Sequence, residues 1–176
     1  MQSDEELMRE FQKGKPEAFE ELFRRYVHLM YAFFRRRLTD TSRAEDLAQE
    51  TFMVILRGGE RYEERAKFRT YLYAVALKLL WGERRRESRD RLIDRNVDEL
   101  SQEHDPSTSV WIREALGRLD GRHREVLMLR EYEQLSYEEI AELLAIPVNT
   151  VRSRLFRARA ELKASLEQQI TRETSQ

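Results

Sequence analysis

Apolar residues recur at spacings of three and four along much of this chain of 176 residues. The clearest run is in the first half, at Phe19, Leu22, Phe23, Tyr26, Leu29, Met30, Phe33 and Phe34. This period places apolar side chains on one face of an α-helix, whereas a half-buried strand would alternate at every second residue. Only 6 glycines and 3 prolines interrupt the chain. The sequence therefore predicts an all-α protein.

The first two helices of the first half have clear boundaries. One is predicted from Asp4 to Lys13 and stops before Gly14. The next is predicted to start near Pro16, because proline is favoured in the first turn of a helix. The apolar run described above lies on this second helix.

The third and fourth helices follow. The third is expected to begin at Ser42, with Glu45 completing a capping box, and to end at Gly58-Gly59. Its apolar face would be formed by Ala44, Leu47, Ala48, Thr51, Phe52 and Ile55. The fourth is predicted from Phe68 to Glu87. Its inner side would carry Leu72, Val75, Ala76, Leu79 and Leu80.

A change of composition after this helix indicates a domain boundary. Between Asp94 and Asp105 the chain is acidic and shows no apolar periodicity. We expect two small helical domains, residues 1–87 and 108–170, joined by a flexible acidic linker over residues 88–107. Shorter helices are predicted in the second domain over residues 110–119, 122–131, 137–144 and from 149 to about 168.

Composition also excludes several classes of protein. The chain has no cysteine and 3 histidines, which lie in different segments. It has no glycine-rich phosphate loop and no nucleophile elbow, so we predict no enzyme activity, cofactor, metal or small-molecule substrate. The acidic N-terminus does not resemble a secretory signal and no apolar stretch could span a bilayer, so a cytoplasmic protein is expected. The formal net charge of -1 indicates no particular partner.

The strongest motif is LSYEEIAELLAIPVNTVRSRLFRARAEL, from Leu135 to Leu162. A short helix capped by Ser136, with Glu139 at the capping-box position, is followed by a tight connector and a second helix. This is the helix-turn-helix arrangement, whose second helix enters the DNA major groove. A merely basic, solvated helix would not explain the cap, the turn and the basic face together. That face carries Asn149, Thr150, Arg152, Ser153, Arg154, Arg157 and Arg159.

A second motif, AEDLAQETFMVILR, covers residues 44–57. Its outward face would carry acidic, amide and thioether side chains, namely Asp46, Gln49, Glu50 and Met53. Such a face is suited to docking a basic partner helix. On the pattern alone, an ordinary solvated helix face is the better explanation.

A third motif, FRTYLYAVALKLLWGERRR, covers residues 68–86 and interleaves aromatic with basic residues. Aromatic rings stack on unpaired bases while cations hold the phosphate backbone, so the motif suits single-stranded nucleic acid. Positions on the face of Leu72, Val75 and Leu79 are expected to belong to the core instead. Contact with nucleic acid is predicted for the loop from Gly58 to Lys67 and for the start of the helix.

Together with AFEELFRRYVHLMY near the start, these motifs resemble an extracytoplasmic-function sigma factor of bacterial RNA polymerase along nearly the whole chain. The resemblance implies that the DLAQETF helix binds the clamp helices of the polymerase core. It also implies that the N-terminal domain melts the downstream (minus-ten) promoter element, while the C-terminal domain binds the upstream (minus-thirty-five) element and the polymerase flap. The linker would lead toward the RNA exit path, and an anti-sigma factor is a further implied partner.

The resemblance also implies which residues contact the promoter. The opened strand of the downstream element is expected at Arg61, Tyr62, Arg65, Phe68, Arg69, Tyr71 and Lys78. The upstream element is expected at Asn149, Thr150, Arg152, Ser153, Arg154, Phe156 and Arg157, with Thr150 and Arg154 on phosphates. Phe156 lies beside the apolar face of its helix and could equally be a core residue.

The chain departs from the family pattern at a few positions. Lys78 stands where the family usually has asparagine, so the downstream base preference is expected to differ. Gln134 and Asn149 replace common glycines. Asparagine tolerates left-handed backbone better than most residues, so we expect the helix-turn-helix to survive the change at Asn149.

A stand-alone helix-turn-helix regulator is the main alternative function. It would bind duplex DNA without core polymerase and would need a sensor or dimerisation domain in residues 1–90. The aromatic and basic stretch over residues 68–86 fits strand melting better than ligand sensing. A purely structural adapter would leave the arginine face unexplained.

Overall fold

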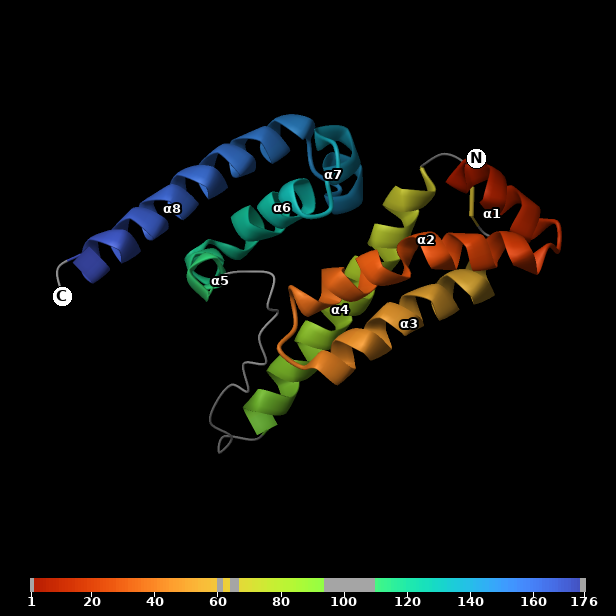
Figure 1. Cartoon of the computed structure of the whole chain (residues 1–176), viewed down its shortest axis with the longest axis horizontal. Helices are drawn as coiled ribbons and strands as arrows, with labels where there is room; N and C mark the ends of the chain where they lie inside the picture. The colour runs from red at the N-terminus through yellow and green to blue at the C-terminus, as the bar shows by residue number, and fades with distance from the viewer. Residues whose placement is uncertain (1, 60–61, 64–66, 94–109, 175–176) are drawn as a thin grey trace. The chain divides into compact units, whose positions relative to one another are not determined.

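The computed structural model describes residues 2–59, 62–63, 67–93 and 110–174. Contacts divide the chain into two compact units, Met1–His104 and Asp105–Gln176. Every regular element of the described residues is an α-helix (Figure 1), which confirms the predicted all-α fold. None of the described helices has the length and apolarity needed to cross a bilayer.

In its described part the first unit contains α1 (Asp4–Gln12), α2 (Pro16–Arg35), α3 (Thr41–Gly58) and α4 (Phe68–Ile93). Ser3 and Glu6 form a capping box at the start of α1. Gly14 has a φ of 87°, which glycine adopts without strain, and makes the turn into α2. α2 packs along α3, and α4 packs against α3 (Figure 1).

The start of α3 differs from the prediction. Asp40 is the N-cap, and its carboxylate accepts a hydrogen bond from the backbone N–H of Arg43 at 3.1 Å. The predicted capping box at Ser42 and Glu45 is wrong, because the helix already begins at Thr41. A carboxylate caps a helix as well as a hydroxyl does and is also favoured by the helix dipole.

The core of the first unit is formed mainly by α2, α3 and α4. All the residues predicted for the inner face of α3 are buried. The predicted stripe of α2 is wider than its buried face, since Phe23 and Leu29 are 40% and 46% exposed. In α4, Leu77 is buried and Leu79 is only half-buried. The other buried side chains of α4 include Phe68, Leu72, Tyr73, Val75, Ala76 and Leu80.

The second half of α4 extends beyond its predicted end. The helix continues past Glu87 to Ile93, so residues 88–93 of the predicted linker are helical. Arginine and leucine in this stretch favour helix. Residues 94–107, the rest of the predicted linker, lie outside the described residues.

An ion pair joins the first turn of α3 to the middle of α4. Glu83 is 7% exposed, and its Oε2 accepts a hydrogen bond from Nη2 of Arg43 at 2.7 Å. This hydrogen bond and the charge of Arg43 lower the pKa of Glu83, although burial opposes the shift. Glu83 therefore stays ionised inside the unit.

The described part of the second unit contains α5 (Val110–Arg118), α6 (Gly121–Glu131), α7 (Tyr137–Leu144) and α8 (Val148–Thr174). α8 packs against each of the other three helices. The predicted helices are confirmed, except that α8 continues beyond Gln168. The centre of the unit is formed by Val126, Leu129, Leu135, Ile140, Val151 and Leu155.

Candidate promoter and polymerase interfaces

α7 and α8 form the predicted helix-turn-helix. Ser136 Oγ accepts a hydrogen bond from the Glu139 N–H at 3.1 Å, and the Glu139 carboxylate accepts one from the Ser136 N–H at 2.7 Å. This is the predicted capping box. α7 ends at Leu144, with Ala145 as its C-cap, and the N–H of Ile146 donates to the carbonyl oxygen of Ala141 at 3.0 Å. These contacts fix the turn that leads into α8.

The helix-turn-helix is intact, as expected, but the left-handed backbone of its turn does not lie at Asn149. Asn149 lies in the first turn of α8, which begins at Val148. Among the described non-glycine residues, Gln134 and Ala145 have positive φ values, of 54° and 52°. Each costs roughly 1 kcal/mol relative to glycine. The turn is therefore completed before Pro147, and Asn149 is available on the helix surface.

α8 separates an inner apolar face from an outer polar face. Val151, Leu155 and Ala158 are at most 1% exposed. Phe156 is 76% exposed, so it is a surface residue and not part of the core. The other predicted upstream-element residues are also exposed or half-exposed, namely Asn149, Thr150, Arg152, Ser153, Arg154 and Arg157.

Two residues at the start of α6 extend this surface, and the sequence analysis missed them. Arg122 and His123 line a hollow together with four of the predicted residues of α8, Thr150, Ser153, Arg154 and Arg157. The guanidinium groups of this hollow favour a phosphate, whereas the Asp120 carboxylate, which accepts a hydrogen bond from the N–H of Arg122 at 2.8 Å, opposes one. Asp120, the N-cap of α6, also lines the hollow. Its pKa is lowered by the hydrogen bond from the Arg122 N–H.

The outward face of α3 is accessible over its whole length. Asp46, Gln49, Glu50 and Met53 are all exposed. Exposed apolar side chains that the sequence analysis did not include lie next to them, with Val54 at 38% and Leu56 at 43%. Phe23 of α2 extends the apolar part, because its ring packs edge-on against Phe52 with centroids 4.8 Å apart. We call Asp46, Gln49, Glu50, Met53, Val54 and Leu56 the α3 face.

The residues predicted for the downstream element do not all lie together. Phe68 is 0% exposed and Tyr62 is 6% exposed, so neither ring is open to a base in this arrangement. Their rings pack together with centroids 6.2 Å apart. Arg61 and Arg65 lie outside the described residues.

The remaining predicted residues lie on two sides of α4. Tyr71 and Lys78, seven residues apart, share one face, whereas Arg69 lies on another, with its guanidinium 5.9 Å from the Tyr73 ring centroid. Trp81 is 38% exposed and three residues beyond Lys78, on the same face. Burial raises the pKa of Tyr71. We call Tyr71, Lys78 and Trp81 the downstream surface.

Comparison with known proteins identifies the family. The model of Sigma-70 region 2 matches residues 22–90, and that of Sigma-70 region 4 matches residues 109–162. The ECF RNA polymerase sigma-E factor of Salmonella typhimurium is 32% identical over 187 residues, which cover 97% of each chain. The chain belongs to the extracytoplasmic-function sigma factors. RNA polymerase sigma factor YlaC of Bacillus subtilis is also 32% identical to this sigma factor, over 85% of the chain and 92% of the relative.

A solved structure supports the same assignment. CnrH, in complex with the cytosolic domain of CnrY, has a TM-score of 0.71 and 25% identity, and covers 92% of this sigma factor and 95% of its own chain. The region 2 match begins inside α2 at residue 22 and covers α3 and nearly all of α4, and the region 4 match spans α5 to the middle of α8. α1 precedes both matches. The described residues hold no group of His, Asp or Glu placed to bind a metal ion.

Proposed function

We propose that this sigma factor directs RNA polymerase to its promoters through three surfaces. The α3 face binds the polymerase core, α8 binds the upstream element as duplex, and the downstream surface holds the opened strand. It acts in the cytoplasm as an initiation factor and not as an enzyme. The observation that carries the proposal is the outer face of α8, where Arg152, Phe156 and Arg157 are exposed.

The chemistry of α8 suits the edges of base pairs in the major groove. An arginine can donate two hydrogen bonds to guanine, and an exposed aromatic ring can contact a thymine methyl group. Phosphates are expected at Thr150 and Arg154 and in the hollow beside Arg122, where they fix the register of the helix on the duplex. Val151 and Leu155 hold α8 in the unit, so these side chains are presented from a rigid support.

The α3 face combines charge with apolar area. Asp46 and Glu50 give it negative charge, while Met53, Val54 and Leu56 offer apolar surface. A helix surface with basic and apolar side chains would complement both parts. The clamp helices of the polymerase core are the expected partner.

The same face supports control by an anti-sigma factor. CnrH, which this chain resembles, was solved with a second protein, the cytosolic domain of CnrY, bound to it. We propose that a partner of that kind covers the α3 face of this sigma factor, whose exposed apolar side chains need a cover when polymerase is absent. Binding of the anti-sigma factor and binding of the core would then exclude each other.

Binding to promoter duplex with and without core polymerase tests the proposal against a stand-alone regulator. We expect specific binding by the sigma factor only in the presence of core. The double charge reversal Asp46→Arg with Glu50→Arg should abolish it, while Glu17→Arg with Glu20→Arg on the exposed side of α2 serves as the matched control. Equally tight specific binding without core would favour the regulator.

A further inference from the structure

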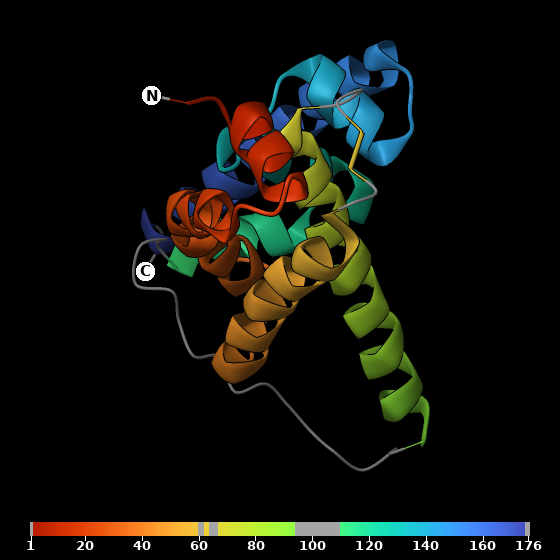
Figure 2. The same cartoon turned by 90° about the vertical axis from the view of Figure 1, so that its right-hand side faces the viewer.

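α1 contacts both ends of the segment that joins α3 to α4. Nε2 of Gln12 donates to the carbonyl oxygen of Gly59 at 2.8 Å and to that of Tyr62 at 2.9 Å. Oε1 of Glu5 accepts a hydrogen bond from the N–H of Phe68, the first residue of α4, at 3.0 Å. Figure 2 shows α1 beside the first turns of α4. One short helix therefore fixes the backbone just after α3 and at the start of α4.

The approach of α1 to the end of α3 is close. A Cβ atom added at Gly59 would lie 2.6 Å from Cε1 of Phe11 and 3.1 Å from Cε of Met8. The φ of Gly59 is -57°, which any residue adopts. Glycine is therefore needed here for space and not for backbone freedom. The ring of Phe11 also packs against that of Phe19 of α2, with centroids 5.0 Å apart.

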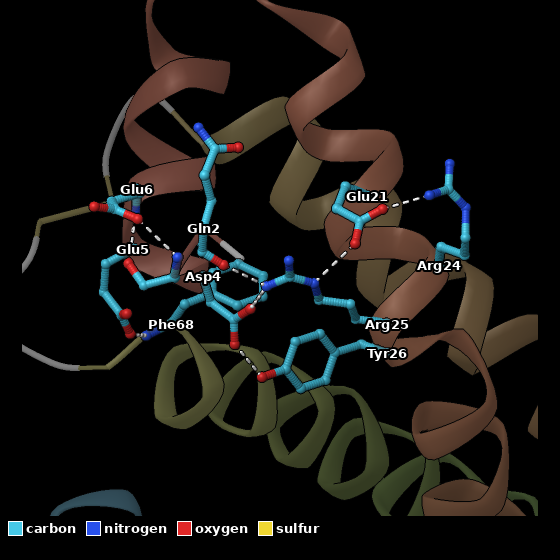
Figure 3. A network of polar contacts seen from close by, with 10 residues as sticks. Gln2, Asp4, Glu5, Glu6, Glu21, Arg24, Arg25, Tyr26 and Phe68 are labelled. Carbon is cyan, nitrogen blue, oxygen red and sulfur yellow. Dashed lines mark hydrogen bonds and ion pairs between the residues drawn. The ribbon is translucent and has the colours of Figure 1, made fainter.

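α1 is itself held on α2 by a polar network (Figure 3). Asp4 accepts hydrogen bonds from Nη1 of Arg25, at 2.7 Å, and from the hydroxyl of Tyr26. Arg25 also donates to the carbonyl oxygen of Gln2 at 3.0 Å. Burial and the bond to Asp4 raise the pKa of Tyr26, so its hydroxyl stays a donor. Because Glu5 follows Asp4, one turn of α1 joins α2 to the start of α4.

The segment that α1 holds includes Tyr62, whose ring supports the downstream surface. The ring of Tyr62 lies against that of Tyr71, with centroids 5.3 Å apart, and is itself only 6% exposed. Gln12 holds the carbonyl group of Tyr62, and Glu5 holds the first N–H of the helix that carries Tyr71. The position of Tyr71 therefore depends on both contacts of α1.

We propose that α1 is a positioning element for capture of the opened promoter strand, and that Gln12 is its central residue. This inference rests on the proposed function of the downstream surface. A segment that is already held in place loses less conformational entropy when it binds a strand. Without the Gln12 contacts, the backbone at Tyr62, whose ring packs on Tyr71, would have to be ordered at the moment of strand capture. α1 lies outside the region 2 match, so the family model does not assign it this role.

Two substitutions of Gln12 separate hydrogen bonding from packing. Gln12→Ala removes both hydrogen bonds, and Gln12→Glu keeps the shape of the side chain but cannot donate to two carbonyl oxygens. With core polymerase, both should reduce promoter opening, measured by permanganate reactivity in the downstream element, by about five- to tenfold. The affinity for core and the preference for the upstream element should stay as in the wild type. Because Gln12 is an exposed side chain, the Tm of the intact chain should fall by about 4 °C or less. Gln168→Ala, at an exposed amide of α8, is the matched control.

A third substitution changes Gly59, the residue whose carbonyl oxygen accepts a hydrogen bond from Gln12. Gly59→Ala should displace α1 and reduce opening in the same direction, because its Cβ would meet the Phe11 ring. The inference is overturned if both Gln12 variants open promoters like the wild type. It is also overturned if only Gln12→Ala is defective, or if core affinity and Tm fall together with opening. Failure of the unaltered chain to open any promoter with core would instead contradict the proposed function.

Discussion

Two phenylalanines predicted to contact the promoter, one on α8 and one at the start of α4, differ completely in exposure. On α8, Phe156 stands 76% exposed next to the arginines, whereas at the start of α4 Phe68 is 0% exposed. A duplex offers its base edges before any change of structure, so the surface that contacts it can be complete in the free protein. An unpaired base becomes available only after unstacking, which costs a few kcal/mol. The proposed contact with the opened strand therefore depends on buried groups, such as Phe68, that support the downstream surface.

The largest expected effect comes from comparing these two phenylalanines. Phe68→Ala should lower the free energy of unfolding by about 3–5 kcal/mol, because it leaves a cavity in the core. Phe156→Ala should change it by about 0.5 kcal/mol or less, since the ring is largely in solvent, and should weaken upstream-element binding instead. Urea titration of each variant measures the difference. Similar losses of stability in both variants would remove the distinction between the surfaces.

The buried ion pair of the first unit should give an effect of intermediate size. Glu83→Gln is expected to cost about 1.5–3 kcal/mol at neutral pH, because the negative charge that pairs with Arg43 is removed and only a neutral amide oxygen is left to accept the hydrogen bond. The folded-state pKa of Glu83 is lowered, so its stabilisation is complete above the ordinary value of about 4.3 and is lost as the pH falls further. The stability difference between wild type and Glu83→Gln should therefore shrink below that pH. A stability difference that stays constant with pH would contradict an ion pair between Glu83 and Arg43.

The arginines of α8 should show effects on binding and not on folding. Arg152→Ala and Arg157→Ala are each expected to cost about 1–3 kcal/mol on the preferred upstream element and to relax the preference at one base position. Arg154→Ala should weaken all sequences alike and reduce the salt dependence of binding, because its proposed partner is a phosphate and not a base. Competition binding of the holoenzyme to upstream-element variants distinguishes the two outcomes. Lys163→Ala, at an exposed position further along α8, is the control.

The smallest expected effect is at Lys78. Lysine carries only donors, so it favours a phosphate or a base acceptor, whereas an asparagine amide also offers an acceptor. Lys78→Asn should change the downstream base preference by about 1 kcal/mol or less without changing core binding. Permanganate footprinting on downstream-element variants measures it. An unchanged preference would place Lys78 away from the bases.

Local sequence signals predicted the helices and much of the exposed surface. The inner face of α3 and the capping box of Ser136 and Glu139 follow from spacing within one helix, and both are confirmed. The spacing also indicated which polar residues of α8 point outward. At Phe156 it left the choice between core and surface open, and only the fold decided it.

Features that depend on distant parts of the chain could not be predicted in this way. The burial of Phe68 results from packing against Tyr26 and Tyr62, whose rings come from α2 and from the segment after α3. The contact of Gln12 with Gly59 joins residues that are far apart in sequence. Ser42 and Asp40 are both acceptable caps by type, so composition alone could not choose between them.

The most direct test of the account compares run-off transcription from duplex promoters and from templates with an unpaired downstream element. Tyr71→Ala with Lys78→Ala should be strongly defective on duplex and recover most activity on the unpaired template, because the unstacking cost is already removed. Arg152→Ala with Arg157→Ala should stay insensitive to the upstream sequence on both templates. The proposal that α4 holds the opened strand would be contradicted if the Tyr71 and Lys78 variant were equally defective on both templates. The proposal that α8 recognises the upstream duplex would be contradicted if the arginine variant recovered upstream discrimination.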